Sequence, residues 1–173
     1  MSQESQIRQN YHPETEAAVN KQANKEHAAS YTYTSLYIYF DRDDVALPGL
    51  QKFFKGLSDQ KKEFGQKWHH HQTERGGRVV LMDIPKPPQD SWGSPQEALE
   101  TALALEKELN QSMLDVYELA HKHDDEHTSD FIEDTFLHTQ VDNIKTIGDH
   151  LTNLKRCGSG LGVYMFDRGL GKE

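Results

Sequence analysis

Four long stretches of the chain repeat apolar residues at alternating intervals of three and four, and this pattern constrains the fold more than any other feature. Such spacing places apolar side chains on one stripe of an α-helix and leaves charge on the opposite face. Pro13 suits a first helical turn, and the Gly76-Gly77 pair suits a helix end. Ser94-Pro95-Gln96-Glu97 has the form of a capping box. We therefore predict helices over residues 13–40, 48–74, 95–122 and 126–156.

The connections between these helices indicate how they are arranged. Two of the connections are short and polar, FDRDD after the first helix and HDDEH before the fourth. The stretch between the second and third helices, RVVLMDIPKPPQDSWG, contains three prolines and reads as extended chain. It can cross the whole bundle, since extended chain covers about 3.3 Å per residue. The prediction is an all-α four-helix bundle with one long crossover, and a short fifth helix over residues 161–168 after the Gly158-Ser159-Gly160 link.

Length and charge set limits on organisation and partners. With 173 residues the chain fits one domain, residues 1–173. Its 28 acidic and 19 basic residues give a net charge of −9, which opposes nonspecific binding to nucleic acid. No run approaches the roughly 18–20 apolar residues that span a bilayer, so no membrane partner is expected. The single cysteine, Cys157, cannot form an internal disulfide, and no apolar segment follows Met1, so we expect a cytoplasmic location.

Each helical stripe carries one polar residue near its middle. These residues are Glu26, Lys61, Glu106 and Gln140. An isolated buried charge costs several kcal/mol, so four such groups are tolerated only if they meet and satisfy one another. We therefore expect one polar layer inside the bundle.

A layer of this kind is typical of bundles that bind two iron ions, but two of its positions do not fit that chemistry. Such sites use glutamates and a Glu-x-x-His pair, because iron prefers oxygen and imidazole ligands. Here the corresponding pair is Lys61 and Phe64. A lysine ammonium can only donate hydrogen bonds and repels a cation, and a phenyl ring offers no lone pair.

Nearly the whole chain resembles the animal ferritin family, segment by segment and in the family's order. The segments that carry the resemblance are SQIRQNYH, EAAVN, ASYTY, YFDRDDVALPG, QTERGGRVVL, DIPKP, SWGSPQEAL, ALEKELNQSMLD, SDFIED and IGDHLTNLKR. The resemblance implies a ferritin-like bundle that assembles, with its own copies or with heavy-type subunits, into a hollow 24-subunit shell. Such a shell stores ferric iron, so iron is the expected cargo and no organic cofactor is expected.

The resemblance also implies roles for the polar residues. In catalytic heavy-type chains, the first iron of the ferroxidase centre is held at the positions of Glu26, Lys61 and Phe64. The second iron is held at the positions of Lys61, Glu106 and Gln140. Light-type chains resemble this sequence in having a lysine at the bridging position.

These matches and departures lead to a hypothesis about the layer. Tyr33 matches the tyrosine that lies beside the centre, and the two glutamates and Gln140 are retained. We expect Lys61 to form a buried ion pair with Glu106, with Glu26, or with both, in place of iron. A residual iron site at Glu26, Glu106 and Gln140 is the alternative.

Two further sets of residues match positions that handle iron in the family. Asp130 and Glu133, with His127 nearby, match residues that line threefold pores. Asp59 and Glu63 match acidic residues that help mineral to nucleate. The alternative for both sets is an ordinary solvated helix surface.

Two features lie outside this scheme. Successive helical residues point about 100° apart, so His69, His70 and His71 should not converge on one metal ion and should bind metal only adventitiously at the surface. The link before the last helix is shorter than the usual family turn, which leaves the direction of that helix open.

Together these observations favour an iron-storage subunit with little or no ferroxidase activity of its own, partnered by heavy-type chains that oxidise iron. The first alternative is a working ferroxidase with an incomplete di-iron centre. The second, from another class, is a scaffold or carrier assembly that stores little iron.

Overall fold

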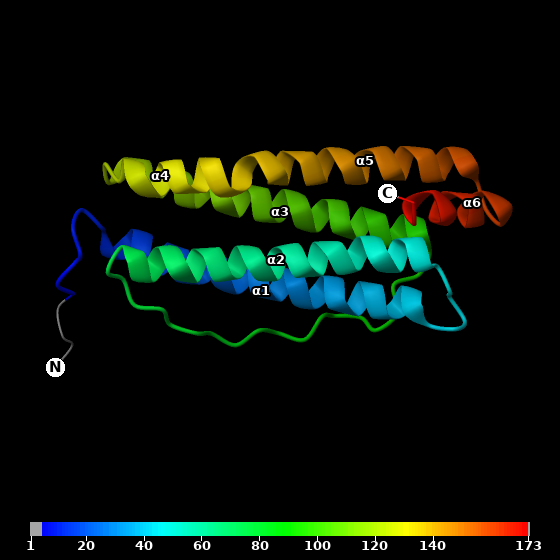
Figure 1. Cartoon of the computed structure of the whole chain (residues 1–173), viewed down its shortest axis with the longest axis horizontal. Coiled ribbons are helices and arrows are strands. Elements are labelled where there is room, and N and C mark those ends of the chain that lie inside the picture. The colour runs from blue at the N-terminus through cyan, green and yellow to red at the C-terminus, as the bar shows by residue number, and fades with distance from the viewer. Residues whose placement is uncertain (1–4, 173) are drawn as a thin grey trace.

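The computed structural model describes residues 5–172, which form an elongated bundle of helices (Figure 1). The elements are α1 (Pro13–Asp41), α2 (Pro48–Glu74), α3 (Pro95–Lys122), α4 (Glu126–Ile132), the π-helical turn η1 (Glu133–Leu137), α5 (His138–Cys157) and α6 (Leu161–Leu170). Because α4, η1 and α5 follow one another without a break, they form the fourth long helix of the bundle. The predicted all-α four-helix bundle, with one long crossover and a short C-terminal helix, is confirmed.

Local sequence signals fix the starts of three helices. His12 precedes α1, and its Nδ1 accepts a hydrogen bond from the Glu14 backbone N–H at 3.1 Å. The predicted capping box of α3 is present, since Ser94 Oγ accepts from the Glu97 N–H at 3.2 Å and the Glu97 carboxylate accepts from the Ser94 N–H at 2.7 Å. Asp125 accepts from the Thr128 N–H at 3.1 Å at the start of α4. These side chains satisfy backbone donors that have no partner within the helix.

The start of α2 is capped from a distant part of the chain. Leu47, the residue before α2, provides no side-chain hydrogen bond. Instead, the buried carboxylate of Asp167 in α6 accepts from the N–H groups of Gly49 and Leu50 at 3.0 and 2.7 Å. A Cβ at Gly49 would lie 2.0 Å from the Asp167 carbonyl oxygen, so only glycine allows this approach. The direction of α6, which the sequence left open, is therefore set by a helix cap.

The polar layer divides the hydrophobic core into two clusters. One cluster includes Tyr33 and Phe54 and lies toward α6 and the start of α3. The other includes Phe64 and Trp68 and lies toward the turn between α3 and α4. On every long helix, the polar residue of the stripe falls between the members of the two clusters.

The π-helical turn shifts the buried face of the fourth helix by one residue. Counted back from Gln140, the three-and-four spacing predicts that Leu137 and Glu133 lie on that face, but Glu133 is exposed and Leu137 is only partly buried. Ile132 and Phe136 are fully buried instead. A π-turn bonds residue i to i+5, so it inserts one extra residue and changes the phase of the stripe on its N-terminal side. Gln140 follows the turn and keeps its predicted position.

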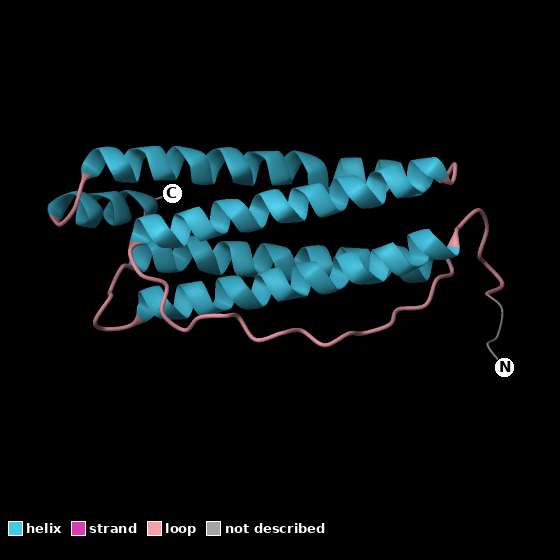
Figure 2. Ribbon diagram, turned by 180° about the vertical axis from the view of Figure 1, so that it is seen from behind, coloured by secondary structure: helices cyan, strands magenta, loops and turns pink. Residues whose placement is uncertain are grey.

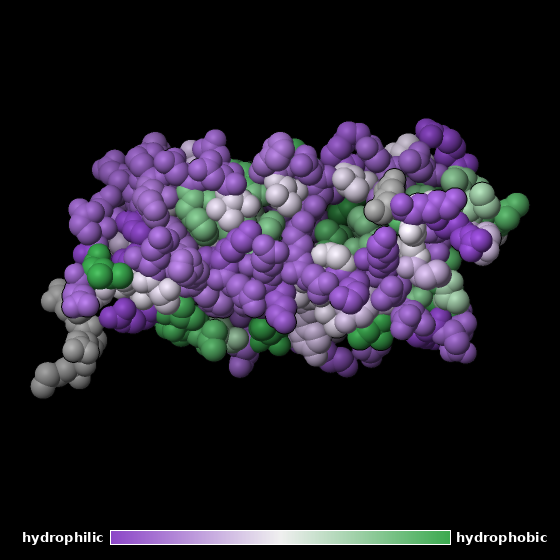
Figure 3. Space-filling view, viewed as in Figure 1, coloured by the Kyte–Doolittle hydropathy of each residue, from purple (hydrophilic) through white to green (hydrophobic). Residues whose placement is uncertain are grey.

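The crossover runs along the outside of the bundle beside α1 (Figure 2). It is held there by side chains of α1, since Asn20 bonds the backbone of Arg78 at 3.0 Å and of Val80 at 3.2 Å, and Ser35 accepts from the Trp92 indole at 2.9 Å. Hydrophobic residues gather along the edge of the molecule where the crossover lies (Figure 3). The exposed ones in this segment are Val80, Leu81, Met82 and Ile84. None of the helices between residues 5 and 172 is both long and apolar enough to cross a membrane.

Candidate metal centre

Side chains from all four long helices meet in one buried layer. Glu26 and Tyr33 come from α1, Lys61 from α2, Glu106 from α3 and Gln140 from α5, and each is fully buried. The regular three-and-four spacing brings these positions to the inner face, as predicted.

Lys61 lies at the centre of this layer. Its Nζ is 2.9 Å from Glu106 Oε2 and 2.8 Å from Gln140 Oε1. Tyr33 donates from its hydroxyl to the other Glu106 oxygen, Oε1, at 2.7 Å. Gln140 also donates to the Glu106 carboxylate and, at 2.9 Å, to the Glu106 backbone oxygen. The Glu106 carboxylate is therefore saturated by donors from three other helices.

The hydrogen bonds around Tyr33 have an electrostatic consequence. Burial, together with the negative charge of Glu106, raises the pKa of the Tyr33 phenol well above its ordinary value. The phenol thus stays protonated and acts as a permanent donor to Glu106.

Phe64 occupies the position one turn after Lys61, where an imidazole would be required for iron. Its ring packs edge-on against Phe136 with centroids 4.9 Å apart, in the same cluster as Trp68. The Lys61 Nζ lies 5.0 Å from the Phe64 centroid, a cation–π distance. Phe64 therefore extends the hydrophobic core and contacts the ammonium of Lys61.

Glu26 forms its hydrogen bond outside the Lys61 ion pair. Its Oε1 accepts a hydrogen bond from Gln22 Nε2 at 2.8 Å, and Gln22 in turn accepts from Ser112. Its Oε2 is buried and has no hydrogen-bond partner among the described residues. Of the two partners expected for Lys61, Glu106 forms the ion pair, and no hydrogen bond joins Lys61 to Glu26 within residues 5–172.

The environment of Glu26 favours its neutral form. Burial raises its pKa from 4.5 to about 7, although Lys61 and the Gln22 hydrogen bond act in the opposite direction. One ammonium and two carboxylates would leave one excess negative charge in the layer, and a proton on Glu26 removes it.

The residues in this layer do not fit a di-iron site. Where a di-iron site would need a bridging carboxylate, Lys61 provides an ammonium that contacts Glu106 and Gln140, and no imidazole lies in the layer. Binding two Fe(II) ions would require Lys61 to leave a position where it is fully buried and paired. What remains as a possible ligand is the free Oε2 of Glu26.

The residues expected at a pore lie together at the start of the fourth helix. Asp130, Glu133 and His127 are all exposed on α4 and η1. They form no metal-binding group among themselves in the described part of the chain. A site shared between copies of the chain stays a prediction.

The residues expected to nucleate mineral are exposed on α2 but carry ion-pair partners. Asp59 pairs with Lys55 at 2.9 Å, and Glu63 pairs with Lys67 at 3.0 Å, each across one helical turn. Each pair places a cation beside the carboxylate that would attract iron, which dilutes the negative charge of the patch.

The three successive histidines of α2 point in different directions. His69 lies 3.0 Å from His27 between their Nε2 atoms, and His70 is exposed. His71 is buried against the ring of Phe131 with centroids 4.1 Å apart, so the expectation that all three lie at the surface is wrong for this residue. Burial lowers the pKa of His71 to about 4. The helical rotation of 100° per residue separates the three rings.

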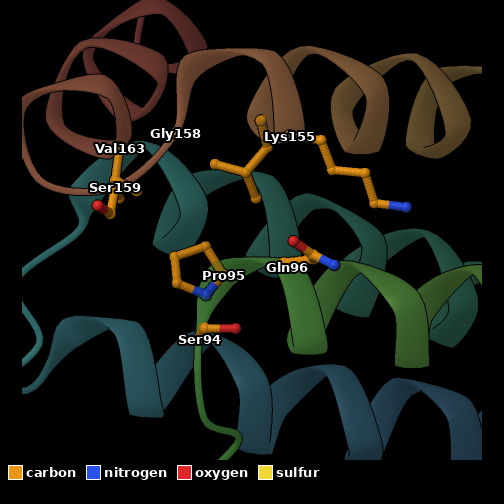
Figure 4. Close-up of a pocket in the computed structure, with 8 residues that line it drawn as sticks. Ser94, Pro95, Gln96, Lys155, Gly158, Ser159 and Val163 are labelled. Atoms are coloured by element: carbon orange, nitrogen blue, oxygen red, sulfur yellow. The ribbon is translucent and has the colours of Figure 1, made fainter.

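Two groups of residues near the ends of the bundle escaped the sequence analysis. His12, Glu14 and His123 form a cluster with potential metal ligands, which we treat below. Because the cluster joins residues more than a hundred positions apart in the chain, no local spacing could have indicated it. At the opposite end, a cavity of about 240 Å³ lies between the start of α3, the end of α5 and α6 (Figure 4). Its only charged lining residue is Lys155, so it offers no metal-binding group.

The sequence of the chain is similar to those of known proteins of one family. Residues 16–157 match the sequence model of the ferritin-like domain. The chain is 54% identical over 164 residues to the soma ferritin of Lymnaea stagnalis, covering 95% of this chain and 94% of that protein. It is 52% identical over 172 residues to the ferritin middle subunit of Aquarana catesbeiana, covering 98% of each, and 52% identical over 167 residues to the ferritin light chain of Bos taurus, covering 95% of each. Because these identities are nearly equal, they do not distinguish between subunit types.

Proposed function

The chain belongs to the ferritin family, and from this premise we propose that it is an iron-storage subunit with little or no ferroxidase activity of its own. In this proposal it contributes to the protein shell, admits iron and supports mineral growth. Oxidation of Fe(II) is supplied by heavy-type subunits in mixed assemblies. The reducing cytoplasm is the compartment that a chain with one cysteine favours.

One observation carries the proposal, namely the buried contact of Lys61 Nζ with Glu106 and Gln140. A positive charge at this point opposes a dication, and it uses the same oxygen atoms that iron would need. Phe64 removes the only imidazole position and fills its space with a hydrocarbon ring. Two ligand positions are therefore lost together.

Surface carboxylates support the storage role. We assign Asp130 and Glu133, with His127, to an iron entry pore formed between copies of the chain. Rings of carboxylates raise the local concentration of cations. Asp59 and Glu63 are assigned to mineral nucleation, which is weak in this chain because each has a lysine beside it.

A second candidate function has one specific observation in its favour. Glu26, which belongs to the layer, has a buried carboxylate oxygen without a hydrogen-bond partner among the described residues. This oxygen could hold one iron ion with help from Glu106, as in a ferroxidase with an incomplete centre. The raised pKa of Glu26 weakens this candidate, because a protonated carboxyl group is a poor metal ligand near neutral pH.

Rapid mixing of Fe(II) with oxygenated protein distinguishes the two functions. The proposal expects no fast phase of oxygen consumption in the natural chain. Lys61→Glu combined with Phe64→His restores the missing ligands, so this variant should gain such a phase. Lys62→Glu is the matched control, because it makes the same charge change on the exposed side of the same helix. A fast phase in the natural chain would establish the second candidate.

Crystals soaked in Fe(II) provide an independent test. The proposal expects anomalous scattering only near the pore residues and the acidic residues of α2. Peaks beside Glu26 and Glu106 would instead identify a working, incomplete centre.

A further inference from the structure

We propose that His12, Glu14 and His123 form a binding site for a divalent transition metal of the Zn(II) class. These residues lie at the end of the bundle where α1 begins and α3 ends, away from the buried layer. One potential ligand atom from each lies within 4.8 Å of the other two, and this is the one such group found between residues 5 and 172. The site takes no part in the storage function proposed above.

The three side chains already contact one another. His123 Nε2 is 2.8 Å from Glu14 Oε2, and the rings of His12 and His123 stack with centroids 3.5 Å apart and an interplanar angle of 6°. His12 Nδ1 accepts the Glu14 N–H, which places the hydrogen of the neutral ring on Nε2. To bind a metal through Nε2, that hydrogen has to move to Nδ1, and the bond to the Glu14 N–H is then given up.

Bonds that do not involve the imidazoles hold the two segments together. Asn10 donates to the Asp124 backbone oxygen at 2.9 Å, so a residue just before His12 is tied to the residue just after His123. Arg75 pairs with the buried Asp125 at 2.6 Å and donates to the Asn10 backbone oxygen at 2.8 Å. Asn10 and Asp124 both have positive φ, 51° and 54°, so the backbone on each side makes a tight turn. These bonds hold the backbone segments that carry His12 and His123 close together without using either imidazole.

The chemistry of the donors selects the metal. Two imidazole nitrogens and one carboxylate oxygen suit Zn(II) and its neighbours in the first transition row, and a fourth position is left for water. At a metal–ligand distance of about 2.0–2.2 Å, tetrahedral geometry places ligand atoms roughly 3.3 Å apart. The cluster has to contract slightly and the stacked rings have to fan apart, so that both lone pairs converge. Exposure permits this movement, since 18% of the His123 side chain and 56% of the Glu14 side chain are accessible.

Metal binding replaces a proton that the cluster now shares. The hydrogen bond between His123 and Glu14 requires a hydrogen on Nε2, and a bound metal takes the place of that hydrogen. The positive charge of Lys122, which acts on Glu14, repels a bound cation. The attraction between the metal ion and its three ligands has to exceed this repulsion. The bound metal ion would link the start of α1 to the end of α3.

The proposal is tested with Zn(II) by titration calorimetry and with Co(II) by visible absorbance, both on the assembled protein. Neither probe is oxidised under these conditions, so the result is independent of iron oxidation and of the proposed storage function. His123→Gln removes one ligand. His12→Asn removes another while keeping a side chain suited to capping α1. His121→Gln is the matched control, because His121 lies two residues away and forms only an exposed pair with Glu126.

The natural chain and the His121→Gln variant should bind one more Zn(II) per chain than the His123→Gln and His12→Asn variants, or bind it at least about tenfold more tightly. Co(II) should give the intense bands of four-coordinate geometry in the first two proteins only. A Zn(II)-soaked crystal of the natural chain should have an anomalous peak bonded to His12, Glu14 and His123. Equal stoichiometry, affinity and spectra in all four proteins, or a crystal with Zn(II) elsewhere and none between these residues, would overturn the proposal.

Discussion

At the scale of single residues, Lys61 is the group on which the buried layer depends. Desolvation makes a buried ion pair costly, so the pair with Glu106 is not stabilising in itself. Once Glu106 is buried, however, the ammonium is the cation that balances its charge. Removing Lys61 alone leaves the charge of Glu106 buried without compensation. This costs far more free energy than replacing both residues by apolar ones would.

We therefore expect Lys61→Ala to lower the free energy of unfolding by about 3–5 kcal/mol per subunit. Guanidinium denaturation of the purified protein measures this change. Combining Lys61→Ala with Glu106→Gln should recover part of the loss, because it removes the unpaired charge. If the Lys61→Ala variant and the natural chain have the same denaturation midpoint, Lys61 does not compensate the buried charge of Glu106.

Glu26 makes the stability of the protein depend on pH. Its pKa is raised in the folded state, from 4.5 to about 7. Between these two values the folded chain holds a proton that the unfolded chain releases, so stability falls as pH rises through this window. The loss amounts to about 3 kcal/mol when complete.

The variant Glu26→Gln has no proton to release at this position, so its stability should not fall through the same window. Denaturation midpoints of the two proteins at pH 5 and pH 8 measure the effect, and taking their difference cancels other groups that titrate in both. A constant difference across this range would show that Glu26 has an ordinary pKa.

The sequence predicted which residues enter the buried layer but not how they pair. Helical spacing is enough to place Lys61 and Glu106 on inner faces. The choice of Glu106 over Glu26 as the partner depends on the rotation of each helix about its axis, to which sequence spacing is insensitive. Gln22, which bonds Glu26 instead, lies one turn earlier and outside the predicted stripe, so its role was not foreseen.

At the scale of helices, α6 is attached to the bundle through a cap. Asp167 provides the side-chain acceptor at the start of α2, with two hydrogen bonds to backbone N–H groups. Hydrogen bonds to a charged acceptor contribute about 1.5–3 kcal/mol each. The same residue therefore stabilises one helix and positions another.

Asp167→Ala should loosen α6 and cost about 2 kcal/mol or more. Hydrogen exchange should become faster both in α6 and in the first turn of α2, a pairing that a purely local effect would not produce. Asp149→Ala is the control, because Asp149 is exposed on α5 and pairs only with Lys145. Unchanged exchange in the first turn of α2 would contradict the capping role.

Helix ends were readable from the sequence to the extent that their signals are local. The Ser94–Glu97 box and Pro13 are contiguous signals, and the helices begin where these predict. The Asp167 cap and the η1 turn were missed for different reasons. Asp167 comes from 118 positions away from Gly49 in the chain, and η1 is a change of hydrogen-bond pattern inside a continuous helix that no glycine or proline marks.

At the scale of the whole molecule, the polar layer lies between two hydrophobic clusters, which adjoin it through Tyr33 and Phe64. This arrangement explains how the bundle can hold polar and charged groups at its centre and still keep its fold. The surrounding apolar residues fix the helices, and the layer has only to be satisfied internally. Lys61, Tyr33 and Gln140 satisfy Glu106 in this way, while one oxygen of Glu26 has no partner among the described residues.

The same arrangement leads to a prediction about mixed assemblies. If the chain stores iron but does not oxidise it, cages built from it alone should take up Fe(II) at least about tenfold more slowly than cages of an active heavy-type subunit, since two metal ligands are missing. In mixed cages the oxidation rate should rise with the fraction of active subunits. The iron content per cage should stay high over a wide range of that fraction, because this chain still provides shell and entry surface.

The measurements are oxygen consumption and iron per cage at defined mixing ratios. The control is a mixed cage in which the heavy-type subunit has a disabled centre. Neither the rate of oxygen consumption nor the iron content of this cage should rise above that of cages built from this chain alone. A steady fall of iron content in proportion to the added chain would instead indicate a scaffold that stores little iron.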